Sequence, residues 1–187
     1  MNDVFNTSFV AFIQNANSEC VRPSAFTAEG RHDFQCIALG GDFYSPSATI
    51  NRQFSPLGSA PIDLAQALEA SGEWLGVFRK ETSTTREYIV VGDPLGYCPV
   101  FYAQTPDGLM ISDSFPALSA TLQRVGVAPA FNLPYYITSI LNKHPHFDNP
   151  HLGTTMHEGV HILPPNRAIY VTPESWSIVN RKQLYSP

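Results

Sequence analysis

The residues best suited to chemistry lie near the end of the chain, in the stretch TTMHEGVHILPPN. His157, Glu158 and His161 match H-E-x-x-H, in which two histidines on one helix face bind zinc and the glutamate lies beside the metal-bound water. Pro164 and Pro165 follow almost at once, and proline cannot occupy the interior of the helix that this site requires. We therefore interpret HEGVH as turn and strand. A strand would place the two histidines on one face about 13 Å apart, too far to share an ion.

A wider histidine cluster leaves metal binding open as an alternative. Five of the six histidines fall within 18 residues, and His144 and His146 lie in the sequence HPHFDNPHLG. Tracts of this kind bind transition metals in some proteins and arise by chance in others. A metal-binding module with His144 and His146 as ligands is therefore one hypothesis, whereas the main interpretation below needs no metal or cofactor.

Composition and charge narrow the class of protein. The chain has 187 residues, a net charge of −5 and no run of basic residues, which argues against nucleic acid or an anionic membrane as partner. Cys20, Cys36 and Cys98 form no C-x-x-C pair, as is typical of reduced cytosolic thiols. The apolar run at the N-terminus is too short for a signal or a membrane span. We expect one cytoplasmic domain over 1–187, with Cys98 as a structural cysteine.

The elements that must position these residues follow from the hydrophobic pattern. Apolar runs bounded by turn signals predict strands at 8–14, 35–44, 73–80, 86–93, 100–104, 108–112, 159–163 and 168–172. Helical spacing predicts helices at 63–72, 114–126 and within 129–143. ETSTT and TPDG are expected to close two hairpins, Ser114 to cap a helix that ends at Gly126, and Gly40-Gly41 to break the second strand. This order predicts an α+β protein with mostly antiparallel sheet and helices packed on it.

One long stretch, 72–122, is more specific than these patterns. Its element GDPLGYCPVFY, with Asp93, Pro94, Gly96 and Pro99, resembles the "R-D-P-L-G-x-R-P-L-Y-Y" of the glutaminase domain in the asparagine synthetase family. GGDFYS is similar to the family's "N-G-E-I-Y-N", and the end of TTMHEGVHILPPN to its "G-I-x-x-L-P-P-G". The resemblance implies a single class II (type 2) glutamine amidotransferase-like domain with the N-terminal-nucleophile (Ntn) hydrolase fold, an αββα sandwich. The Asp-Pro-x-Gly element forms a tight turn between two strands, so the resemblance at these residues indicates the fold more than the chemistry.

The chemistry is where the sequence departs from the family. The family's nucleophile is an N-terminal cysteine whose free α-amine is the base, but this chain begins Met1-Asn2 and has Thr7 or Ser8 at the aligned position. Four residual positions of this chain correspond to the family's glutamine pocket, namely Gly40, Gly41, Asp42 and Asp63. Gly40 replaces an oxyanion-stabilising Asn, Asp42 replaces a Glu, and Asp63 falls two or three positions later than the Asp that binds the substrate amine.

We therefore expect a catalytically inactive pseudo-amidotransferase, closest in character to the inactive domains of β-lactam synthetases and lasso-peptide cyclases. In those proteins the domain adjoins an ATP-dependent amide-forming synthetase, and this chain contains no S-G-G-x-D-S pyrophosphate loop. The expected partner is such a synthetase in cis or in trans, within peptide or natural-product biosynthesis, and a homodimer is a further expectation. The enzymatic alternative is a residual Ntn amidohydrolase or glutaminase that uses Thr7 or Ser8 after N-terminal processing.

Overall fold

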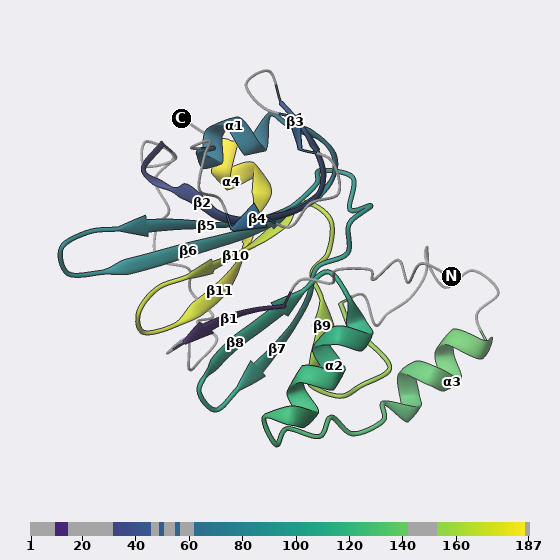
Figure 1. Ribbon diagram of the computed structural model, residues 1–187. Helices are drawn as coiled ribbons and strands as arrows, with labels where there is room; N and C mark the ends of the chain where they lie inside the picture. The colour runs from purple at the N-terminus through teal and green to yellow at the C-terminus, as the bar shows by residue number, and fades with distance from the viewer. Residues whose placement is uncertain are drawn as a thin grey trace, which may run out of the picture.

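Two antiparallel sheets and four helices make up the part of the chain that the computed structural model describes, namely residues 10–14, 32–45, 49–50, 55–56, 62–141 and 153–185. Figure 1 shows the two sheets lying against each other, with helices on their outer sides. The predicted mixed α+β class with mostly antiparallel sheets is confirmed.

The larger sheet has seven strands, in the order β11-β10-β6-β5-β2-β3 with β4 also paired to β2. Its strands are β2 (Gln35–Tyr44), β3 (Thr49–Ile50), β4 (Ser55–Pro56), β5 (Ser71–Glu81), β6 (Arg86–Gly92), β10 (Arg167–Val171) and β11 (Trp176–Asn180). The predicted hairpin between β5 and β6 is confirmed, since Glu81 pairs with Arg86 across the tip. Thr82 and Thr85 close this tip, with Thr82 N donating to Thr85 O over 2.9 Å.

The smaller sheet has four strands in the order β1-β8-β7-β9. They are β1 (Val10–Gln14), β7 (Phe101–Thr105), β8 (Gly108–Ser112) and β9 (Val160–Ile162). The β7–β8 hairpin predicted from TPDG is confirmed, because Thr105 pairs with Gly108. The N-terminal strand β1 lies at the edge, where Val10 pairs with Ser112.

Three apolar clusters define the order of the layers. Because side chains of a strand alternate between its faces, β5 sends Trp74 and Phe78 to a cluster with α1 (Leu64–Leu68) and α4 (Arg181–Tyr185). It sends Leu75 and Val77 to a second cluster between the two sheets. On the outer face of the smaller sheet, α2 (Phe115–Arg124) packs against β7, β8 and β9. The layers therefore follow the order helix, sheet, sheet, helix. Helix α3 (Leu133–Leu141) lies beyond α2, away from α1 and α4 (Figure 1).

Helix capping follows the sequence closely. Asp63 caps α1 through a capping box with Gln66, and Ser114 caps α2 as predicted. Gly126, with φ +82°, follows the end of α2 as expected. Helix α1 is shorter than predicted and ends at Leu68, because Ser71 already pairs with Tyr44 in the larger sheet.

Other elements differ from the prediction. The second strand is not broken at Gly40-Gly41: β2 runs through both glycines, and its ladder with β5 is irregular only between Cys36 and Ala38. Strand β11 and helix α4 at the C-terminal end were not predicted, nor were the two-residue strands β3 and β4. The strands predicted on either side of PPNR belong to different sheets, so this turn carries the chain from one sheet to the other.

Candidate functional site

The residual glutamine-pocket positions Gly40, Gly41 and Asp42 lie side by side in β2, opposite Leu75, Trp74 and Glu73 of β5. Gly41 has φ +92°, and a Cβ atom there would lie 2.0 Å from the carbonyl oxygen of Glu73. Gly72 of β5 has φ +112° and the reciprocal contact, 2.0 Å from the carbonyl oxygen of Asp42. Only glycine tolerates this combination of backbone angle and close approach. The two backbones therefore fill the space between these positions.

The fourth pocket position, Asp63, is not brought together with the other three. It pairs with Gln35 at the start of β2, five residues and about 15 Å along the strand from Gly40. Its Oδ1 accepts a hydrogen bond from Gln66 N at 2.8 Å, and its Oδ2 lies 2.9 Å from His32 Nδ1. One carboxylate oxygen thus caps α1, and the other contacts His32.

The carboxylate of Asp93 organises the turn that follows β6. Asp93 is 3% exposed. Its Oδ1 accepts from the backbone N–H of Leu95 (3.0 Å) and Tyr97 (3.1 Å), and its Oδ2 from that of Cys98 (2.7 Å). A buried carboxylate with three backbone donors fixes the path of the chain between β6 and β7.

The rest of this element packs on the turn at 164–166. Pro94 and Pro99 are half-buried. Gly96 has φ +73°, and a Cβ atom there would lie 2.9 Å from Pro165 Cγ. The two motifs that carry most of the family resemblance therefore touch each other, although they are far apart in sequence.

The two cysteines within the described residues are poorly suited to nucleophilic attack. Burial raises the pKa of the Cys36 thiol to about 12. Burial, together with the negative charges of Asp113, Asp93 and Glu73, raises the pKa of the Cys98 thiol to about 12. Because the thiolate is the nucleophilic form, neither sulfur is activated near neutral pH, and the prediction of a structural Cys98 agrees with this environment.

Alkylation provides a test of these thiols. At pH 8.5 we expect iodoacetamide to modify Cys36 and Cys98 of the folded protein about 10³-fold more slowly than in 6 M guanidinium, because the thiolate fraction falls tenfold per pKa unit. Peptide mass spectrometry would assign each site separately. Because burial raises the pKa of both thiols in the folded state, their contribution to the free energy of unfolding is fully present below about pH 8.5. It is lost as the pH rises towards 12, where the thiols ionise in the folded protein as well. Equal alkylation rates in the folded and the unfolded protein would contradict the raised pKa of the two thiols.

The HEGVH segment forms a turn followed by β9, as interpreted from its sequence. Because the strand begins only at Val160, the two histidines lie on opposite faces of the smaller sheet rather than on one face. His157 Nδ1 lies 3.1 Å from Ser119 Oγ of α2, on the helix side. His161 stacks on Tyr102, with ring centroids 5.3 Å apart, on the side of the second sheet. Both rings are half-buried and already in contact with protein.

The remaining candidates lie outside the described part of the chain. These are Thr7 and Ser8 of the enzymatic alternative and His144 and His146 of the metal-binding alternative. Among the residues that are described, no three His, Cys, Asp or Glu side chains are grouped as metal ligands would be.

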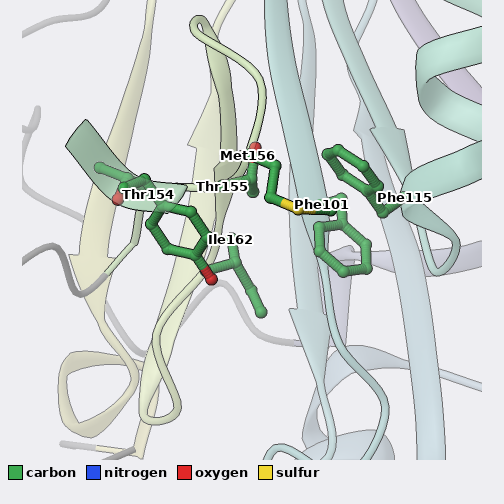
Figure 2. A pocket seen from close by; sticks show the side chains of 7 residues that line it. Phe101, Phe115, Thr154, Thr155, Met156 and Ile162 are labelled. Carbon is green, nitrogen blue, oxygen red and sulfur yellow. The ribbon is translucent and has the colours of Figure 1, made fainter. Parts of the chain in front are cut away.

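Sequence reasoning missed an apolar pocket on the outer side of the smaller sheet. The pocket has a volume of about 310 Å³ and is lined by Phe101, Phe115, Tyr135, Thr154, Thr155, Met156 and Ile162. Figure 2 shows Phe101 and Phe115 together on one side, with Met156 extending towards them. The Thr155 hydroxyl already donates to the carbonyl oxygen of Val160 over 2.7 Å. The lining therefore favours contact with an apolar group over polar chemistry.

Sequence reasoning also missed the buried Arg181 at the start of α4. Its side chain is directed at the larger sheet: Nη1 donates to the carbonyl oxygen of Gly92, and the guanidinium lies 5.7 Å from the centre of the Trp74 ring. Its backbone N–H donates to the carbonyl oxygen of Asn166 over 2.7 Å. Arg181 thus ties the C-terminal helix to the end of β6. Nothing in the polar sequence RKQLY distinguished this arginine from a surface residue.

Within the described ranges, every helix is too short or too polar to cross a membrane. Comparison of the chain with family models, with curated proteins and with solved structures finds no match.

Proposed function

We propose that this chain is a non-catalytic, type 2 glutamine amidotransferase-like domain of the Ntn-hydrolase class. In this proposal it acts as a structural partner of an ATP-dependent, amide-forming synthetase, supplied in cis or in trans. The observation that carries the proposal is Gly40, which lies in β2 opposite Leu75 of β5. It has no side chain at the position where the family's Asn stabilises the oxyanion, and its neighbour Asp42 stands where the family has a Glu.

Two further observations support the fold assignment within this proposal. The layers follow the order helix, sheet, sheet, helix, as an αββα sandwich requires. The Asp93 turn and the Pro164-Pro165 turn occur in the family's order, and Gly96 meets Pro165 in space. Motifs that touch each other are better support than motifs matched one at a time.

The loss of activity is supported residue by residue. Gly40 offers no side-chain donor to an oxyanion, and Asp63 is engaged at the N-terminus of α1. Both described cysteines are held as neutral thiols. An oxyanion donor alone contributes about 3 kcal/mol to catalysis of acyl transfer, so its loss together with that of the substrate clamp removes most glutaminase activity.

The proposal predicts that the purified chain releases no ammonia from L-glutamine. Intact-mass measurement should give the unprocessed N-terminus, and incubation with a glutamine-derived diazoketone should add no mass. The matched controls are the Thr7→Ala and Ser8→Ala variants, which should behave as the parent does. Ammonia release that disappears in one of these variants would establish the residual amidohydrolase instead.

The partner role requires a separate measurement. Adding the chain to a synthetase encoded beside it should raise the rate of carboxylate-dependent pyrophosphate exchange, and the two proteins should co-elute in gel filtration. Failure of both results would overturn the partner role even if the chain has no glutaminase activity.

A further inference from the structure

Helix α3 turns an apolar stripe towards solvent. Its sequence, LPYYITSIL, contains no charged residue. Leu133, Tyr136, Ile137 and Ile140 recur at the spacing of one helix face, and their exposed fractions are 53, 42, 47 and 61%. In a helix that packs only on its own protein, such a stripe faces the core. Here it faces outward.

Two neighbouring side chains extend this stripe into a continuous surface. Phe131 is 52% exposed and lies against Tyr136, with ring centroids 5.3 Å apart. Met156 is 43% exposed, and its carbonyl oxygen accepts a hydrogen bond of 2.8 Å from Asn132 N. The backbone thus holds both residues beside the start of the helix. We call the set Phe131, Leu133, Tyr136, Ile137, Ile140 and Met156 the α3 face.

The α3 face adjoins the apolar pocket. Met156 belongs to both, and Tyr135 of α3 also lines the pocket. The protein therefore presents protruding side chains and a recess on the same side. Buried aromatic and aliphatic anchors that enter such recesses supply most of the binding energy in protein interfaces.

The size of the α3 face matches half of a stable dimer interface. Six large side chains, each about half exposed, present roughly 600 Å² of mostly apolar surface, at the upper end for the largest patch on a monomer. A standard interface buries about 800 Å² per partner, and in homodimers about 65% of this area, or roughly 500 Å², is apolar. One copy of the α3 face is therefore enough for one side of a dimer.

We propose that a second copy of this chain covers the α3 face, with α3 packed on α3 about a two-fold axis. In a two-fold interface each copy presents the same surface, so the recess of one copy can receive the protruding side chains of the other. The chain carries a net charge of −5, which opposes self-association in general. The α3 face contributes none of this charge, and it is therefore where two copies can approach. This inference is independent of the proposed function.

Sedimentation equilibrium of the full chain between 1 and 100 µM tests the dimer. We expect twice the 20.6 kDa mass of one chain at the upper concentrations. Ile137→Asp and Ile140→Asp should each weaken association at least 100-fold, because two copies of the charge would be buried at the axis. The matched control is Val125→Asp, at a residue that is 54% exposed and outside the α3 face; it should leave association unchanged.

A cross-link checks the geometry independently of these variants. Mild oxidation of the Ile140→Cys variant should give a disulfide-linked dimer that the parent chain does not form. Circular dichroism confirms that each variant is folded, as expected for changes at half-exposed positions. A parent chain that is monomeric at 100 µM overturns the inference, as does a dimer that persists in both aspartate variants. A monomer that forms a stable complex with the synthetase through the α3 face also overturns it, in favour of that partner.

Discussion

Replacing Gly41 by alanine is expected to lower the free energy of unfolding by about 4 kcal/mol or more. Two penalties combine in this variant. Its backbone angle of φ +92° is strained for any L side chain, and the new methyl group would lie 2.0 Å from the carbonyl oxygen of Glu73. The obstacle is backbone rather than a flexible side chain, so β2 and β5 must separate in the middle of the larger sheet. Urea unfolding followed by circular dichroism measures the change.

The chain offers a matched control for this prediction. Gly126 has a similar angle, φ +82°, but a Cβ atom there would meet nothing within 4 Å. Gly126→Ala should therefore lower the free energy of unfolding only through the strained backbone angle, by about 1 kcal/mol. The difference between the two variants isolates the cost of the collision. If Gly41→Ala proved no more destabilising than Gly126→Ala, the result would contradict the close approach of β2 and β5 at Gly41.

Replacing Asp93 by alanine should cost about 4 kcal/mol, because three backbone N–H groups lose a charged acceptor and are left inside the protein. Asp93→Asn should cost less, about 2 kcal/mol, since the amide oxygen can still accept the hydrogen bonds that Oδ1 accepts in the parent. The donors involved are those of Leu95, Tyr97 and Cys98. Urea unfolding again gives the free energy, and the slope should not change.

Glu174 provides the comparison for a carboxylate outside the core. It is exposed in the turn between β10 and β11, and Glu174→Ala should change the free energy by no more than about 0.5 kcal/mol. A loss below about 1 kcal/mol for Asp93→Ala would show that its hydrogen bonds do not hold the turn.

The parts of the fold that could be predicted are those whose signals are local. The β5–β6 hairpin, the β7–β8 hairpin and the Ser114 cap depend on residues a few positions apart, and all three were predicted. The break predicted at Gly40-Gly41 was wrong, because both glycines keep their pairing with Leu75 and Trp74 of β5 although Gly41 has φ +92°. That pairing depends on residues of another strand, which the pattern of β2 alone does not contain.

The C-terminal elements were missed for a related reason. Helix α4 has five residues and no helix-forming pattern of its own; it depends on Leu184 in the core and on Arg181 over Trp74. Short helices gain most of their stability from tertiary packing. Strand β11 is similarly short and ends where α4 begins.

The same distinction between local signals and contacts formed only on folding applies to the candidate site. The structural role of Asp93 could be expected from the Asp-Pro-Leu-Gly sequence, which is typical of a tight turn. The apolar pocket could not, because its lining comes from β7, α2, α3, β9 and the 154–156 segment, which meet only in the folded chain. The exposure of α3 is also invisible in sequence, since the same stripe predicts a buried face equally well.

The close approach of each glycine, Gly41 and Gly72, to the facing strand has a consequence for how this protein can evolve. Each glycine is enforced by the backbone of the strand that carries the other, so a side chain gained at one position is rejected while the strands keep their present spacing. Selection on stability is therefore expected to remove a side chain gained at either position. A designer who wishes to install a ligand pocket between these strands must change their spacing first and choose side chains afterwards.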